Sequence, residues 1–287
     1  MGQHSVPRRY LRNFELSGHP NCIWLYDKNG SRPRVANISK VAQQRSFYDP
    51  AVERELAEGV EQPANKVIQK LRDGRLLSES ERRELALYLA VMLMRVQERR
   101  KRATAMLPGV LDSVIKRARE DIVAVGISSD IEQSVIERIL ARLEVLHATY
   151  AADPPDVVRN RIKSPWPPKA IFEILYEMTW RVLKSSGPSF FLTSDNPAFF
   201  FLGLGLGTPE AEFCMPLSTT HAIHASWQTA PEKLVFIEEL QPVVKEINRR
   251  IASAATRFVF YHEHTEWIQV LLGKEDPRLT RIRWRTK

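Results

Sequence analysis

The chain has 287 residues, of which 44% are hydrophobic and 26% charged, and its formal net charge is +8. This composition is that of a folded globular protein and excludes a disordered or fibrous chain. Two cysteines exclude a scaffold stapled by disulfides, and no apolar run reaches the roughly eighteen residues of a membrane helix. We therefore expect a cytoplasmic protein without a membrane partner.

Residues 1–48 predict a short helix or turn followed by a small β element. Val6, Tyr10 and Phe14 recur every four residues, as on one face of a helix. A β-rich run over 22–26 is followed by Asn29-Gly30, a pair typical of a hairpin turn.

Residues 49–186 predict a helical region. Ser78 and Glu81 have the spacing of a capping box before a long helix over 81–104. Pro108 is expected to start a further helix, and others are predicted over 129–152 and 169–184. The long helices offer an apolar face for a protein partner or a homodimer.

Residues 187–287 predict a mostly β region with one helix over 241–256. Short runs rich in aromatic and β-branched residues predict strands at 189–193, 198–202, 212–215, 222–227, 234–237, 257–262 and 267–272. The fold class is therefore α+β, with a helical middle region packed on a mostly antiparallel C-terminal sheet that the N-terminal β element completes. We expect a single integrated domain over 1–287.

The positive charge is concentrated in three segments. Residues 1–45, 70–120 and 274–287 have net charges of +6, +6 and +4, whereas residues 46–69 and 121–273 have −3 and −5. If the basic segments meet in space, they form a surface that holds phosphates, and RNA or DNA is the partner; otherwise they are separate solvated faces. We expect the N-terminal and C-terminal segments to lie beside the Ser194-Asp195-Asn196 strand end.

Four motifs follow one another along the chain. They are Gln3-His4-x-Val6-Pro7-x-x-Tyr10-Leu11, Thr193-Ser194-Asp195-Asn196-Pro197, Pro216-Leu217-Ser218, and a late helix with Asn248 followed by Arg257. Through them nearly the whole chain resembles the domain of unknown function 4238 family. The resemblance implies one integrated domain and draws attention to these positions, but it implies no settled activity.

His4, Asp195 and Arg257 are the candidate catalytic residues. A histidine can move a proton while arginine stabilises the charge that develops on a phosphodiester, and Asp195 at a strand end can act as a general base. Residues of the same motifs, together with neighbouring arginines, form the predicted substrate-binding set: Gln3, Arg8, Arg9, Tyr10, Ser194, Asn196 and Asn248.

A structural interpretation of the same residues stays open. Gln3 and His4 could attach the N-terminus to the sheet, and the polar residues before Pro197 could bond the backbone of a turn. A catalytic His4 would face a cleft with Asp195 or Arg257 nearby, whereas a structural one would be buried and fully bonded.

We predict no metal and no cofactor. The run His262-x-His264-x-Glu266 places metal-ligand types on one side of a predicted strand, yet it equally describes an exposed polar turn. Walker, G-x-S-x-G and H-E-x-x-H motifs do not occur.

The function that these features predict is a nucleic-acid-directed enzyme. A metal-independent ribonuclease that serves as a toxin or defence effector fits the histidine and arginines. The alternative is a non-enzymatic module that binds nucleic acid or protein, in which the four motifs determine the fold.

Overall fold

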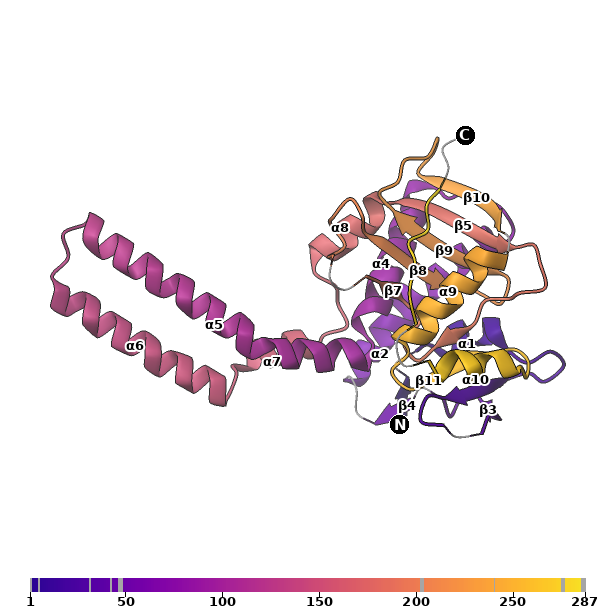
Figure 1. Ribbon diagram of the computed structural model, residues 1–287, viewed down its shortest axis with the longest axis horizontal. Coiled ribbons are helices and arrows are strands. Elements are labelled where there is room, and N and C mark those ends of the chain that lie inside the picture. The colour runs from indigo at the N-terminus through magenta and orange to yellow at the C-terminus, as the bar shows by residue number, and fades with distance from the viewer. Residues whose placement is uncertain are drawn as a thin grey trace. The chain divides into compact units, whose positions relative to one another are not determined.

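The computed structural model describes residues 2–4, 6–30, 32–41, 43–45, 49–201, 204–239, 241–274 and 277–284 (Figure 1). It divides into two compact units, one of Met1–Gln97 with Pro165–Lys287 and one of Glu98–Ser164. The elements and their sheets make the fold α+β, as predicted. This division describes how residues pack and does not test whether the chain folds as one domain. The single integrated domain therefore stays a prediction.

The first unit begins with β-strands and short helices. In chain order its first elements are β1 (Gly2–His4), α1 (Arg8–Leu11), the 3-10 helix η1 (Arg12–Phe14), β2 (Cys22–Asp27), β3 (Arg34–Asn37), β4 (Gln43–Arg45), α2 (Pro50–Glu55), the π-helix η2 (Leu56–Glu61), α3 (Gln62–Arg72) and α4 (Glu79–Met94). β2 and β3 form the expected antiparallel pair, and Gly30 has a φ of 83°. The capping box of Ser78 and Glu81 starts α4, as predicted, but α4 ends at Met94 and not at the predicted 104.

After the second unit, the chain returns to the first. The remaining elements are α8 (Lys169–Glu177), β5 (Thr179–Ser185), β6 (Thr193–Ser194), β7 (Phe199–Phe200), β8 (Glu212–Pro216), β9 (His221–Ser226), β10 (Leu234–Glu239), α9 (Gln241–Ala254), β11 (Phe258–Tyr261) and α10 (Glu266–Leu272). The predicted helix over 169–184 was wrong in its second half. β5 lies between two strands with both faces covered, so its apolar residues lack the alternation that marks a strand.

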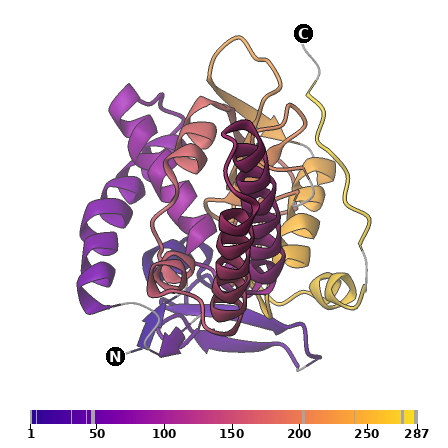
Figure 2. The ribbon, with the colours of Figure 1, turned by 90° about the vertical axis from the view of Figure 1, so that its left-hand side faces the viewer.

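A five-stranded mixed sheet in the order β10-β5-β9-β8-β7 is the middle layer of the first unit. β10 pairs parallel with β5 and the other pairs are antiparallel. Residues such as Trp180 and Phe213 face the core with α4 and α8, whereas Leu183 and Ala222 pack with α9. The purple helices and the orange α9 therefore lie on opposite sides of the sheet (Figure 2).

A second sheet joins the two ends of the sequence. It is antiparallel in the order β3-β2-β11-β6, so the N-terminal strands complete a C-terminal sheet as predicted. The predicted strand over 267–272 was wrong, because these residues form α10. Ile268 is its buried residue, with Leu271 half-buried three positions later, which is helical spacing.

The second unit is a helical hairpin with a short third helix. α5 (Gln97–Ser128) and α6 (Gln133–Ala152) run antiparallel, and α7 (Asp156–Lys163) follows. Pro108 lies inside α5 rather than at a helix start. Among the described residues, no helix is long and apolar enough to cross a membrane.

Candidate functional site

Asp195 lies just after β6, where its carboxylate holds the turn that leads into β11. Oδ1 accepts a hydrogen bond from Thr256 N at 2.8 Å, and Oδ2 accepts from Arg257 N at 2.9 Å and Phe258 N at 3.0 Å. Burial raises the pKa of Asp195, although the three N–H donors act in the opposite direction. These three hydrogen bonds fix the turn. To act as a general base, the Asp195 carboxylate would have to release at least one of them.

The neighbours of Asp195 bond the backbone in the same way. Ser194 Oγ donates to Asn196 O at 2.8 Å, and Asn196 Nδ2 donates to Ala254 O at 2.8 Å at the end of α9. Asn248 accepts from Leu192 N at 2.9 Å and donates to Phe190 O at 2.8 Å. The predicted substrate-binding residues Ser194, Asn196 and Asn248 thus attach one loop to α9.

Arg257 and Tyr10 extend this network to the N-terminal part of the chain. The Arg257 guanidinium forms a bidentate pair with the buried Asp27, with Nη2 to Oδ2 at 2.8 Å. Tyr10 Oη donates to Pro216 O at 2.8 Å and lies 2.7 Å from Thr193 Oγ1. The N-terminal segment therefore lies beside the β6 strand end, as predicted.

Gln3 and His4 belong to β1, whose backbone pairs with β4, and their side chains lie outside the described residues. Arg8 and Arg9 are exposed on α1. The structure thus joins Tyr10, Asp195, Asn248 and Arg257 into one structural network, in which the family motifs meet. Catalysis by His4, Asp195 and Arg257 stays a prediction.

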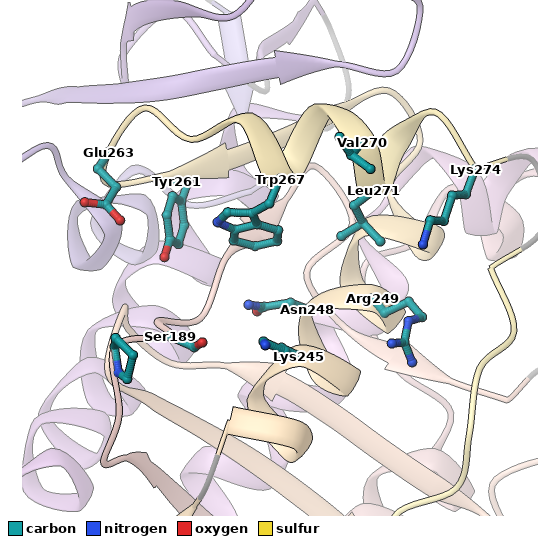
Figure 3. A pocket seen from close by; sticks show the side chains of 11 residues that line it. Ser189, Lys245, Asn248, Arg249, Tyr261, Glu263, Trp267, Val270, Leu271 and Lys274 are labelled. Carbon is teal, nitrogen blue, oxygen red and sulfur yellow. The ribbon is translucent and has the colours of Figure 1, made fainter.

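A pocket of about 410 Å³ opens beside this network, between α9 and α10 (Figure 3). Lys245, Asn248 and Arg249 come from one face of α9, because their spacing of three and four is one helical turn. From the other side come Tyr261 of β11, Trp267 and Leu271 of α10, and Lys274 just beyond it, with Ser189 and Glu263 at the edge.

The charge of the pocket is positive. Three cations line it, Lys245, Arg249 and Lys274, against one carboxylate, Glu263. Arg249 also pairs with Glu246 on the same helix, which orients its guanidinium. An anionic group is therefore the ligand that this lining attracts.

Trp267 gives the pocket an aromatic surface. Its side chain is 41% exposed, and it is the one tryptophan of the six that is exposed. The ring of Tyr261 meets it edge-on, with centroids 5.6 Å apart at 82°, and the Tyr261 hydroxyl bonds to the backbone of Phe190. The edge-on contact supports both rings, and Trp267 presents exposed aromatic surface at the pocket.

Sequence reasoning missed most of this pocket. Asn248 was singled out, but its neighbours Lys245 and Arg249 were not, although their spacing on a predicted helix was visible. Trp267, Leu271 and Lys274 follow one another at four and three residues, and that pattern was hidden because a strand was predicted there.

A buried ionic cluster under the C-terminal segment is the second polar feature that the sequence did not indicate. Glu212 of β8 accepts from His224 Nε2 at 3.1 Å and from Arg250 Nη2 at 2.8 Å. Arg250 also bonds Glu246, which precedes it by one turn of α9. These four side chains are almost fully buried.

Residues 277–284 cover this cluster with backbone and ring donors. Thr280 N donates to Glu246 at 2.8 Å, Ile282 N donates to Glu212 at 3.2 Å, and Trp284 Nε1 donates to His224 Nδ1 at 3.2 Å. The tail therefore contacts β8, β9 and α9, whereas we had predicted it at the β6 strand end.

Burial and hydrogen bonding set the protonation states of the cluster. Burial lowers the pKa of His224, so the ring is neutral, donates through Nε2 and accepts through Nδ1. Burial would raise the pKa of Glu212, but the bonds from His224 and Arg250 hold it below its usual value. Burial raises the pKa of the neighbouring Cys214 thiol to about 11, so this thiol stays protonated and is a poor nucleophile.

No cluster of three metal-ligand side chains is present in the described part of the chain. The run from His262 to Glu266 does not lie on one strand, because β11 ends at Tyr261 and α10 begins at Glu266. His264 instead packs against Trp24, with ring centroids 4.8 Å apart.

Comparison with known proteins places the chain in a family. A family model described as "Protein of unknown function (DUF4238)" matches residues 2–265, so the chain belongs to this family, as its motifs predicted. No curated protein and no solved structure matches the chain. Trp267, Lys274 and the C-terminal segment follow the last matched residue.

Proposed function

We propose that this protein binds single-stranded nucleic acid through the pocket between α9 and α10. The observation that carries the proposal is the combination of three cations with an exposed, fixed tryptophan ring in one pocket. Single strands are held in this way, with phosphates on Lys and Arg and an unstacked base on an aromatic ring.

The C-terminal segment extends the basic surface away from the pocket. Arg278, Arg281 and Arg283 are exposed, while Ile282 between them is buried. Because Thr280 bonds Glu246 and Arg250 of α9, the segment runs along the same helix that carries Lys245 and Arg249. This supports a phosphate track formed by Lys274, Arg278, Arg281 and Arg283.

Binding to a labelled single-stranded oligonucleotide, followed by fluorescence anisotropy at several salt concentrations, tests the proposal. Reversing two charges in Lys245→Glu/Lys274→Glu should weaken binding at low salt at least about tenfold and reduce the salt slope by about 1.4, since each phosphate contact contributes about 0.7. Trp267→Ala should weaken binding by about 1–3 kcal/mol.

Lys169→Glu/Lys184→Glu is the matched control, because it reverses two charges on exposed lysines outside the pocket. It should bind as the unaltered chain does. Failure of the unaltered chain to bind at low salt, or equal losses in the control and in the pocket variant, would contradict the proposal.

Cleavage of the bound strand remains our sequence-based proposal for an enzyme. It is supported by the histidine and arginines of the N-terminal motif, and it predicts cut products in the presence of a chelator. The toxin or defence role rests on the same prediction. If the bound strand stays uncut, the result would contradict the nuclease and favour the non-enzymatic binding module.

Protein partners are a separate proposal, which concerns the helical region. It is favoured by the exposed apolar residues of α5 and α6.

A further inference from the structure

We propose that the hairpin of α5 and α6 is a dimerisation element that pairs with the same hairpin of a second copy of this chain. This goes beyond nucleic-acid binding and does not depend on it. The starting observation is that the hairpin buries only part of its apolar side chains. Ten large apolar side chains of the two helices remain at least 37% exposed. We call five of them the apolar face: Val110, Val114, Ile139, Leu146 and Tyr150.

The two helices pack through one narrow seam. Ile115 of α5 and Ile136 of α6 are buried, and Gly126 lets the helices approach, since a Cβ there would lie 2.8 Å from Ile136 Cγ1. A narrow seam of this kind is enough to pack two helices against each other. A helix in a larger bundle has a wider apolar stripe, because it contacts more than one neighbour.

Polar pairs close one flank of the seam. Arg119 bonds Glu144, and His147 Nε2 lies 2.8 Å from Asp112 Oδ1. Because residues in a helix follow one another at 100°, Asp112 and Arg119 lie on the same side of Ile115. These contacts between the helices define the polar side of the hairpin.

The apolar face lies on the other flank. Around the axis of α5, Val110 and Val114 lie on one side of Ile115, and Asp112 and Arg119 lie on the other. Relative to Ile136, Ile139 and Leu146 are turned away from Glu144 in the same manner. Since the polar flanks meet each other, the opposite flanks share the other side of the hairpin.

The size of this side suits a second hairpin. α6 has 20 residues, which is about 30 Å of helix, and two helices side by side present a width of about 20 Å. The product of this length and width is about 600 Å² per copy, and the accessible surface is larger because side chains make it uneven. A standard interface buries about 800 Å² per partner. Two hairpins joined in this way form a four-helix bundle.

Charge complementarity favours a second copy of this chain over another partner. Arg117 and Asp121 continue the row of Val110 and Val114 along α5, one turn apart and of opposite sign. When two copies of α5 cross antiparallel about a two-fold axis, Arg117 of each meets Asp121 of the other, so the same pair forms twice.

Sedimentation velocity of the full chain over a wide concentration range tests the proposal. The expected species has twice the chain mass of 33.0 kDa. Val114→Glu should raise the dimer dissociation constant at least about a hundredfold. The matched control is Val123→Glu, which puts the same charge on an exposed valine of the same helix, nine residues and about 180° away. Circular dichroism verifies that both variants keep their helices.

A charge reversal tests the two-fold arrangement. Arg117→Asp should weaken the dimer by about tenfold, and the combined Arg117→Asp/Asp121→Arg should restore it. A chain that is monomeric at every concentration, a dimer that survives Val114→Glu, equal losses in Val123→Glu, or no rescue by the double reversal would each overturn the proposal.

Discussion

Asp195 is the residue on which the two interpretations of the Thr193–Pro197 motif differ most. A buried carboxylate that accepts three backbone N–H groups stabilises a turn, because each bond to a charged acceptor contributes about 1.5–3 kcal/mol. A catalytic carboxylate would instead keep an oxygen available to substrate. The contacts of Asp195 therefore agree with the structural interpretation.

Replacing Asp195 with asparagine separates the interpretations. Asp195→Asn keeps the shape but turns one acceptor into a donor that faces N–H groups, so we expect the free energy of unfolding to fall by about 2–3 kcal/mol. Urea denaturation followed by circular dichroism measures it. Asp73→Asn, on an exposed aspartate, should change it by less than about 0.5 kcal/mol. An unchanged stability together with lost strand cleavage would favour the catalytic interpretation.

Local chemistry could be predicted at the residue scale, and distant partners could not. The Asn29-Gly30 turn and the capping box of Ser78 and Glu81 depend on residues within one turn, so their spacing is enough. Asp195 binds the backbone 61 to 63 residues later, and no local pattern names those donors. Its position before a proline indicated a turn but not its partners.

At the scale of elements, two errors had the same origin. β5 was predicted as helix and α10 as strand, because apolar residues rich in aromatic and β-branched types fit both when the periodicity is weak. For β5, burial on both faces removed the alternation. The error at α10 mattered more, since it concealed the helical spacing of Trp267, Leu271 and Lys274 in the pocket.

The C-terminal segment is an element without regular secondary structure that nevertheless holds the ionic cluster. Three of its groups donate to Glu246, Glu212 and His224, all of which are buried. Buried charges that lose their partners are costly, since water does not replace those partners without rearrangement.

Removal of this segment should therefore destabilise the first unit. Truncation after Lys274 is expected to lower the free energy of unfolding by about 3–6 kcal/mol, because two backbone donors to buried carboxylates are lost and each contributes about 1.5–3 kcal/mol. Urea denaturation measures the change. Truncation after Trp284, which keeps the three donors, is the control and should unfold as the full chain does. Equal stability of the two truncated chains would show that the cluster does not need its cover.

At the scale of the whole molecule, burial is unevenly divided between the two units. The first unit contains a three-layer arrangement of helices, sheet and α9, with extensive buried apolar clusters. In α5 and α6 the buried residues are Ile115, Gly126 and Ile136. Helical stability comes mainly from packing of an apolar face, so the hairpin alone should open more readily than the first unit.

Hydrogen exchange of the full chain should reveal this difference and its link to dimerisation. In dilute protein, we expect amides of α5 and α6 to exchange much faster than those of β5, β8 and β9, because opening the hairpin exposes little apolar surface. Raising the protein concentration should slow the hairpin amides alone, since a second copy binds only the closed hairpin. Val114→Glu should abolish that dependence and Val123→Glu should preserve it. Hairpin amides that are protected as strongly as β8 in dilute Val114→Glu protein would show that the hairpin is stable without a partner.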